Sequence, residues 1–352
     1  MVSTCSYEAR VFGVRSAMPM TRALTLCPHA DVVEPRMKRY AEVSSVIMEV
    51  FDRFSPLVEP LSIDEAFIDM SGATRIFGPP RQMAGSLRQA VKEATGGLTV
   101  SVGVASTKFV AKVASDMNKP DGVTVVAPDE VTGFLWPLPV SRIWGVGPKA
   151  QAQLESLGMR RIGDVAVRPR TELAQRFGVH GEQIWLLANG IDEREVEAEY
   201  EAKSVGREFT LEEDVRGRPA IIPHLLRSAD AIARSLRRSN MTAGAVRVKL
   251  KTADFRLLTR QGGLPRPTSS APELMAVALS LLDRFDLSCA FRLVGMTAFA
   301  LAPLPPQEDL FLPAEVRRQR KLDGAVDRVL EKFGDGALWR GCDLPRGNGD
   351  DK

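Results

Sequence analysis

The sequence predicts a multidomain α+β fold, and three observations support this prediction. The chain has 352 residues, more than a single hydrophobic core usually organises. Strand-like and helix-like periods alternate over residues 37–126 and again over residues 204–302. Between them, residues 143–189 have the pattern of short helices interrupted by glycines. The two α/β regions are therefore expected to form separate domains.

The composition excludes several classes of protein. With 44% hydrophobic and 26% charged residues, the chain can bury enough apolar surface to fold. No apolar run approaches the ~18 residues of a membrane helix, and the N-terminus lacks a secretory signal pattern, so we expect a cytoplasmic protein without membrane contact. The four cysteines form no CxxC pair and the three histidines lie far apart. The chemistry must therefore rest on carboxylates, hydroxyls and basic groups.

The first α/β region is predicted to begin with a helix over residues 37–54, because Ile47, Val50 and Phe54 recur at the spacing of one buried stripe. The period then changes to that of two strands with two acidic residues at their junction. The strands and later helices of this region are expected over residues 57–63, 66–70, 80–94, 98–105, 107–115 and 123–126. Together they predict a sheet with helices on one face.

The second α/β region follows an acidic stretch, residues 192–201, which is predicted to be an exposed linker. Residues 204–302 then have the order β-α-β-β-α-β, with helices near 219–239 and 271–285. This order is typical of a small α/β module. A helical pattern over residues 314–333 lies in the tail.

The net charge of +3 is unevenly distributed along the chain. Residues 204–305 carry a net charge of +6, whereas the other three segments each carry −1. The clusters of basic residues in this segment are Arg234, Arg237 and Arg238, then Arg247, Lys249 and Lys251, then Arg256 and Arg260. The middle three alternate and so share one face of a strand. Such a face can follow a phosphate backbone, and a solvated polar face explains the pattern equally well.

The sharpest local motif is S-I-D-E-A-F, residues 62–67. Asp64 and Glu65 lie between two apolar strands, and the tip of a hairpin lets adjacent side chains converge. Two carboxylates held together repel each other unless a cation neutralises them, and Mg²⁺ usually takes one or two protein carboxylates together with substrate phosphates. An ordinary solvated acidic turn is the alternative.

The N-terminal stretch S-T-C-S-Y-E-A-R, residues 3–10, groups hydroxyls, a phenol and a guanidinium. The planar guanidinium of Arg10 suits bidentate contact with a phosphate. A solvent-facing N-terminal helix is the alternative.

A third motif, D-M-N-K-P-D-G, spans residues 116–122. Lys119 precedes a Pro-Asp-Gly turn, so its ammonium could reach a phosphate from a loop tip. A plain turn lysine is the alternative explanation.

The sequence W-G-V-G-P-K, residues 144–149, precedes a helical run that ends near Gly158. Gly145 and Gly147 permit a tight turn, and Pro148 suits the first position of a helix. Free backbone N–H groups at that helix start can bind a phosphate, so we interpret the segment as a helix-hairpin-helix that holds a DNA backbone. A turn between packed helices is the alternative.

The tail contains Q-E-D-L-F, residues 307–311, between prolines. A polar anchor followed by two apolar side chains suits insertion into pockets of a partner. A linker that packs on its own domain is the alternative.

In this order, the motifs resemble those of the Y-family translesion DNA polymerases, in particular the bacterial DNA polymerase IV (DinB-type) branch. The resemblance covers essentially the whole chain and rests on residues 3–19, 62–67, 101–122, 141–158, 203–210 and 307–311.

The resemblance implies a right-hand polymerase. Its parts are small fingers, a ferredoxin-like palm, a helical thumb with the helix-hairpin-helix, an α/β little finger and a tail, over residues 1–36, 37–126, 127–200, 201–303 and 304–352. The basic segment falls where the family places this extra DNA-binding domain.

The implied reaction is error-prone, template-directed DNA synthesis in translesion synthesis and DNA repair, by nucleotidyl transfer with two Mg²⁺ ions. Asp64 and Glu65 would be catalytic and hold the metal. The triphosphate would contact Thr4, Tyr7, Arg10 and Lys119, and the DNA would contact Gly145, Gly147, Lys149, Arg247, Lys249 and Lys251. The chain would act as a monomer on primer–template DNA and deoxynucleoside triphosphates, and would bind the replisome's sliding clamp through Gln307, Leu310 and Phe311.

One departure concerns the first catalytic strand. The family begins earlier, with a D-x-D-x-F-F-like strand that supplies a further metal-binding aspartate, and no such segment precedes residue 3 here. We therefore expect a natural start upstream of Met1 and impaired activity for the chain as written. A non-catalytic adaptor that docks on the clamp and DNA is the alternative function, and a sequence-independent repair nuclease is a third.

Overall fold

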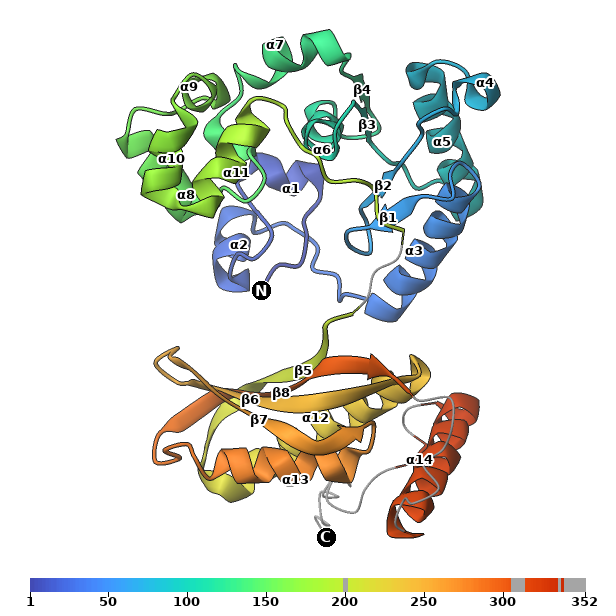
Figure 1. Cartoon of the computed structure of the whole chain (residues 1–352), viewed down its shortest axis with the longest axis vertical. Helices are drawn as coiled ribbons and strands as arrows, with labels where there is room; N and C mark the ends of the chain where they lie inside the picture. Colours follow the sequence, from blue (N-terminus) through green and yellow to red (C-terminus); the bar gives the residue numbers. More distant parts are fainter. Residues whose placement is uncertain (199–201, 305–313, 335–336, 339–352) are drawn as a thin grey trace. The chain divides into compact units, whose positions relative to one another are not determined.

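The computed structural model describes residues 1–198, 202–304, 314–334 and 337–338 (Figure 1). The chain divides into two compact units, Met1–Tyr200 and Glu201–Lys352. Each unit has its own hydrophobic core.

The N-terminal part of the first unit is a small helical lobe. Helix α1 (Tyr7–Val11) begins at Ser6, whose hydroxyl accepts a hydrogen bond from the Ala9 backbone N–H at 3.3 Å. This cap satisfies one of the free N–H groups of the first turn. Helix α2 (Met20–Leu26) follows, and the lobe closes over a core of Val2, Val14, Ala23 and Cys27.

The predicted helix over residues 37–54 is confirmed as α3 (Met37–Asp52), and Val50 and Phe51 of its stripe are buried. Strands β1 (Val58–Pro60) and β2 (Ala66–Ile68) form the predicted antiparallel hairpin. Helices α4 (Thr74–Phe77) and α5 (Pro80–Thr95) follow, and α5 contributes Val91 to the core under the hairpin.

Strands β3 (Val102–Val104) and β4 (Val123–Val125) pair in parallel, and helix α6 (Lys108–Met117) connects them. Gly103 allows α6 to lie directly on β3, because a Cβ at this position would be 2.0 Å from the Ala111 carbonyl oxygen. The expectation of one continuous sheet over residues 37–126 is wrong for the described residues. Strands β1 and β2 form one two-stranded sheet, and strands β3 and β4 form another. No ladder of backbone hydrogen bonds joins the two pairs among the described residues.

The rest of the first unit consists of short helices, as predicted. They are η1 (Pro128–Glu130), α7 (Val131–Leu135), η2 (Val140–Arg142), α8 (Pro148–Ser156), α9 (Ile162–Ala166), α10 (Arg170–Phe177) and α11 (Val179–Ala188). Their core is continuous with α6, since Phe109 and Val113 pack in the same cluster as Leu154 and Leu187.

The expectation of an exposed linker from residue 192 onward is wrong at its start. The Asp192 side chain is buried and accepts a hydrogen bond from the Phe109 N–H at 3.0 Å, so it caps α6. Arg194 pairs with the same carboxylate at 2.7 Å. The neighbouring guanidinium and hydrogen bonds outweigh the effect of burial and lower the pKa of Asp192.

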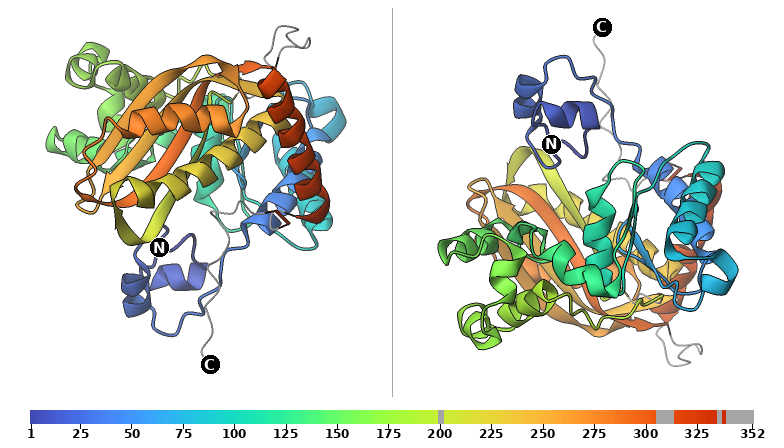
Figure 2. Two further views of the ribbon diagram at one scale, coloured as in Figure 1. Left: turned by 90° about the horizontal axis from the view of Figure 1, so that it is seen from below. Right: turned by 90° about the horizontal axis from the view of Figure 1, so that it is seen from above.

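The second unit has the predicted order β-α-β-β-α-β. Its elements are β5 (Ser204–Arg216), α12 (Gly217–Arg238), β6 (Met241–Thr252), β7 (Leu257–Thr268), α13 (Ala271–Leu282) and β8 (Ala290–Pro303). The strands form one antiparallel sheet in the order β5-β8-β6-β7. Both helices cover the same face of this sheet (Figure 2, left), and the other face carries no helix of this module.

The predicted tail helix is confirmed as α14 (Ala314–Phe333). Arg237 of α12 binds it through Asp327 at 2.6 Å and Asp323 at 3.7 Å. These carboxylates outweigh burial and raise the pKa of Arg237. In the part of the chain that the structure describes, no helix has the length and apolar character needed to cross a membrane.

Candidate active site and nucleic-acid interface

The hairpin between β1 and β2 presents the two predicted catalytic carboxylates. The Glu65 carbonyl accepts hydrogen bonds from the N–H groups of Leu61 at 2.8 Å and Ser62 at 3.3 Å, which closes the loop. Asp64 lies exposed at its tip, and its carboxylate accepts a hydrogen bond from the Ser62 hydroxyl at 2.5 Å. The predicted hairpin is therefore present, and its two carboxylates have different partners, Ser62 and Lys112.

The partner of Glu65 is Lys112, whose Nζ lies 2.7 Å from Glu65 Oε1. Lys112 projects from α6, so this ion pair ties the hairpin to the helix that follows β3. Lys112 was not among the predicted site residues. It lies within residues 101–122, one of the segments on which the family resemblance rests, and had no role assigned to it.

Lys119 follows α6 and pairs with Asp116, with 2.7 Å between Lys119 Nζ and Asp116 Oδ1. Partial burial would lower the pKa of Lys119, but the hydrogen bond and charge of Asp116 and the charges of Glu65 and Tyr7 outweigh it, so this pKa is raised. The structure thus brings Lys119 into the electrostatic neighbourhood of one residue from the hairpin and one from the N-terminal lobe.

The N-terminal residues of the predicted site lie on and before α1. Tyr7 and Arg10 are exposed, and the Arg10 Cζ lies 5.4 Å from the centre of the Tyr7 ring. Arg10 also donates to the Cys5 carbonyl at 3.4 Å. Thr4 is exposed, and among the described residues no hydrogen bond or ion pair joins Thr4 or Arg10 to the hairpin.

The acidic residues of the hairpin fit one Mg²⁺ ion. Within the described ranges, no cluster of three or more His, Cys, Asp or Glu side chains could hold a metal. Mg²⁺ commonly binds through one or two carboxylates and completes its shell with water and substrate phosphates. Asp64 and Glu65 supply two carboxylates of this kind, of which Glu65 is paired with Lys112, and the predicted second ion has no carboxylate set of its own among the described residues.

The predicted helix-hairpin-helix lies between η2 and α9. Gly145 has φ +90°, which a side chain would strain, and Gly147 is the N-cap of α8 with Pro148 as its first residue. The element before the turn is a 3₁₀ turn instead of an α-helix. Lys149 is exposed beside the free N–H groups of the first turn of α8.

The predicted basic face of the second unit is confirmed. Along β6, Val246, Val248 and Leu250 are fully buried, and Arg247, Lys249 and Lys251 alternate with them on the face that α12 and α13 do not cover. Lys249 forms an ion pair with Glu208 of β5, across the strand that carries Gly295. Arg247 donates to Gln261 at 2.8 Å.

Two residues of the basic segment lie elsewhere. Arg237 is occupied by the acidic side chains of α14, and Arg260 packs over Phe285, 5.1 Å from its ring centre. Arg260 also donates to the Arg284 carbonyl at 3.3 Å. The predicted clusters therefore do not form one surface. The predicted clamp-binding residues Gln307, Leu310 and Phe311 lie outside the described residues.

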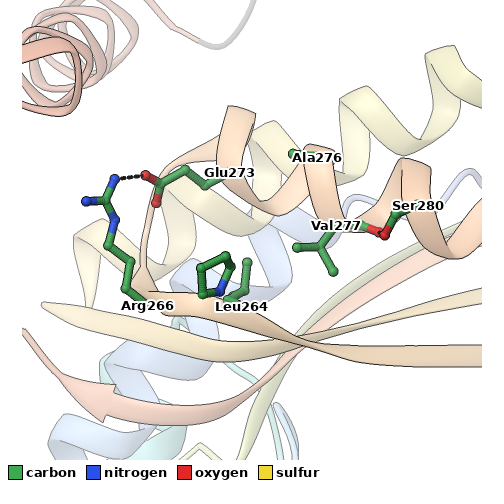
Figure 3. Close-up of a pocket in the computed structure, with 7 residues that line it drawn as sticks. Leu264, Arg266, Glu273, Ala276, Val277 and Ser280 are labelled. Carbon is green, nitrogen blue, oxygen red and sulfur yellow. Dashed lines mark hydrogen bonds and ion pairs between the residues drawn. The ribbon is translucent and has the colours of Figure 1, made fainter. Parts of the chain in front are cut away.

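A pocket of about 440 Å³ lies between β7 and α13 (Figure 3). Leu264 and Val277 contribute apolar walls, and an ion pair of 2.5 Å between Arg266 and Glu273 lies at its edge. The pocket contains none of the predicted site residues.

Family comparisons agree with this arrangement. The model of the impB/mucB/samB family matches residues 1–116, and its C-terminal domain model matches residues 202–310. The helix-hairpin-helix motif model of the same family matches residues 128–159.

Relatives match over most of the chain. A protein named DNA polymerase IV from Desulfatibacillum aliphaticivorans is 41% identical over 96% of this chain and 86% of its own length. A protein of the same name from Xanthomonas campestris pv. campestris (strain 8004) is 43% identical over 84% of this chain and 82% of its own length.

Solved structures show the same architecture. A Y-family DNA polymerase chimera, Dbh-Dpo4-Dbh, has a TM-score of 0.76 and 28% identity, covering 85% of this chain and 86% of that chain. An insertion ternary complex of Dbh DNA polymerase has a TM-score of 0.61 and 27% identity, covering 86% and 87%.

The fold and the site define a right-hand nucleotidyltransferase, and the chain belongs to the Y-family of DNA polymerases. Within that family, its relatives are the DNA polymerase IV enzymes, and the activity is DNA-directed DNA synthesis of the translesion type. The predicted fold class, family and enzyme class are confirmed, and the non-catalytic adaptor is not favoured.

Proposed function

We propose that the β1–β2 hairpin is the catalytic centre, with Asp64 and Glu65 as metal-holding carboxylates. The observation that carries this proposal is the electrostatic coupling of the Lys119 ammonium to Glu65 of the hairpin and to Tyr7 of the N-terminal lobe, beside the exposed carboxylate of Asp64. Acidic groups would bind a cation, while Lys119 and Tyr7 would bind phosphate oxygens. Thr4 and Arg10 complete the proposed triphosphate site.

In the proposed reaction, the primer 3′-hydroxyl attacks the α-phosphate of a deoxynucleoside triphosphate and pyrophosphate leaves. Bound Mg²⁺ supplies charge neutralisation and favours loss of the hydroxyl proton. Lys119 is suited to the leaving pyrophosphate, because its ammonium is positively charged at neutral pH and a point charge of this kind binds phosphate oxygens. Ser62 holds the Asp64 carboxylate in place. Two Mg²⁺ ions remain our proposal, of which these residues account for one.

Primer–template DNA is the proposed macromolecular substrate. The first turn of α8, with Gly145, Gly147 and Lys149, would bind phosphates through backbone N–H groups. Arg247, Lys249 and Lys251 would bind further phosphates from the open sheet face. A related solved structure, an insertion ternary complex of Dbh DNA polymerase, supports this proposal by analogy.

The remaining assignments follow the family. We propose fingers, palm, thumb, little finger and tail over residues 1–36, 37–126, 127–200, 201–303 and 304–352. The little finger boundary is supported by the division of the chain at Tyr200 and Glu201. Gln307, Leu310 and Phe311 would bind a sliding clamp, and a monomer in the cytoplasm, where bacterial DNA lies, would carry out the reaction.

Primer extension by an Asp64→Asn variant tests the proposed centre. We expect at least a ~100-fold loss of extension, because the carboxylate neutralises the metal that stabilises the transition state. Duplex binding should be unchanged, since Asp64 lies away from the proposed DNA contacts in sequence and carries no positive charge. Asp52→Asn, an exposed acid at the end of α3, is the matched control. Extension at the wild-type rate by Asp64→Asn would remove the hairpin from the mechanism.

A further inference from the structure

The turn between β6 and β7 presents an exposed aromatic ring in a conformation that disfavours it. Phe255 has φ +67°, in the left-handed region that glycine adopts freely and other residues adopt with strain. Its side chain is 62% exposed. Strain of this kind persists only where the surrounding structure holds it, and it concentrates at functional sites.

The surrounding turn does hold it. The Phe255 N–H donates to the Thr252 carbonyl at 2.9 Å, and the Thr252 N–H donates to the Arg256 carbonyl at 2.9 Å. The Thr252 hydroxyl accepts from the Arg256 N–H at 3.0 Å, and the Ala253 N–H donates to the Ala290 carbonyl at 2.9 Å. The ring is therefore exposed to solvent on a turn whose backbone is held by hydrogen bonds.

Two cations lie against the ring. The Arg292 Cζ lies 4.1 Å from the ring centre and the Lys251 Nζ lies 5.1 Å from it. Lys251 ends the basic row of β6, so the ring continues that row. Within the described ranges, neither cation forms an ion pair.

Arg292 reaches the ring because β8 is irregular at this point. The pairing of β6 with β8 passes from Lys251 with Leu293 directly to Thr252 with Phe291, so Arg292 has no partner on β6. It has none on β5 either, where the pairing breaks between Thr210 and Val215. A bulge of this kind redirects a side chain. The turn thus fixes the position of the exposed Phe255 ring, and the bulge in β8 brings Arg292 next to it.

We propose that Phe255, Lys251 and Arg292 form a clip for the DNA backbone, in which the ring packs against a deoxyribose and the two cations bind its flanking phosphates. A deoxyribose has apolar C–H groups and a phosphate on each side. These groups complement an aromatic ring that lies close to two cations. The contact carries no sequence information, because phosphates and sugars are common to all nucleotides. This inference rests on the proposed DNA-binding face of the little finger.

The decisive variant is Phe255→Gly in the full chain. Glycine accepts φ +67° without strain, so the variant removes the ring while the turn keeps its conformation. Affinity for a short primer–template duplex, measured by fluorescence anisotropy, should fall by about 5- to 10-fold, as expected for loss of one ring contact. Asn240→Gly, at another left-handed turn position of this unit (φ +51°), is the matched control and should leave the affinity unchanged.

The salt dependence separates the parts of the clip. Arg292→Gln should reduce the slope of log affinity against log salt by about one, because one phosphate contact is lost. Phe255→Gly should leave this slope unchanged. Wild-type affinity in both variants would overturn the clip.

A further variant separates this inference from the proposed function. Arg247→Gln with Lys249→Gln removes two proposed phosphate contacts outside the clip. If this pair weakens binding and Phe255→Gly does not, only the clip is wrong. If neither changes the affinity, the proposed DNA-binding face of the sheet is wrong as well.

Discussion

Lys119 is the residue whose environment most directly suggests its role. Its ammonium is partly buried, paired with Asp116, and electrostatically coupled to the Glu65 carboxylate and to Tyr7. A lysine held as a point charge beside an acidic hairpin can bind the phosphates that accompany a metal ion. The position of this charge, more than its presence, supports the proposed triphosphate site.

Removing this charge should weaken nucleotide binding. We expect Lys119→Met to raise the KM for deoxynucleoside triphosphate about 10-fold or more, because a charged hydrogen bond to phosphate is lost. Steady-state primer extension at varied nucleotide concentration measures this. Lys92→Met, an exposed lysine on α5, is the control and should leave KM unchanged. An unchanged KM in Lys119→Met would place the triphosphate elsewhere.

The Asp116–Lys119 pair also predicts a pH dependence. Because the folded-state pKa of Lys119 is raised, the pair stabilises the folded protein fully below the ordinary lysine pKa and loses this effect as pH rises through the folded-state value. Asp116→Asn should therefore destabilise the protein at neutral pH and move the alkaline fall in nucleotide binding to lower pH. Chemical denaturation and KM at several pH values would test this. An alkaline limb at the wild-type position would contradict it.

At the scale of elements, the contact between β3 and α6 positions the site. Helix α6 supplies Lys112 to the hairpin and ends just before Lys119, so its distance from β3 sets where both lysines lie. Gly103 makes the close approach possible, because a Cβ would lie 2.0 Å from the Ala111 carbonyl oxygen and 2.4 Å from the Ser115 nitrogen. Backbone atoms on a packed helix cannot move aside cheaply.

Gly103→Ala should therefore destabilise the first unit by about 3 kcal/mol or more and reduce primer extension, because α6 must shift. Gly133→Ala is the matched control, since nothing lies within 4 Å of a Cβ there and the helix α7 should gain up to about 1 kcal/mol. Denaturant unfolding measures both. Equal stability of Gly103→Ala and wild type would show that the close packing of α6 on β3 is not required.

At the scale of the whole molecule, periodicity predicted most of the elements. Apolar residues recur with a helical period around Val50 in α3, and apolar and basic residues alternate with the strand period around Arg247 in β6. In each element, the period determines which face is buried. Contacts between residues far apart in the sequence could not be predicted from periodicity. The Asp192 cap on α6 joins residues 83 apart, and an acidic stretch has the same pattern whether it is exposed or buried.

The residues of the candidate site show the same difference between local motifs and long-range contacts. Asp64, Glu65 and Lys119 belong to local motifs, so the sequence alone singled them out. Lys112 was missed because its partner, Glu65, lies 47 residues away and the spacing carries no periodic signal. Phe255 was missed because a left-handed backbone at a phenylalanine has no signature in the sequence. Residues of the candidate site were therefore found from the sequence where they are neighbours in the chain.

The central claim, that Asp64 and Glu65 act together on one metal ion, is tested most directly by single-turnover nucleotide insertion. The rates to compare are those of wild type, Asp64→Asn, Glu65→Gln and the double variant, each at saturating Mg²⁺ and DNA. Residues that act as a unit are non-additive, so the double variant should be about as slow as the slower single variant. Losses that multiply in the double variant, or insertion at the wild-type rate in either single variant, would contradict the account.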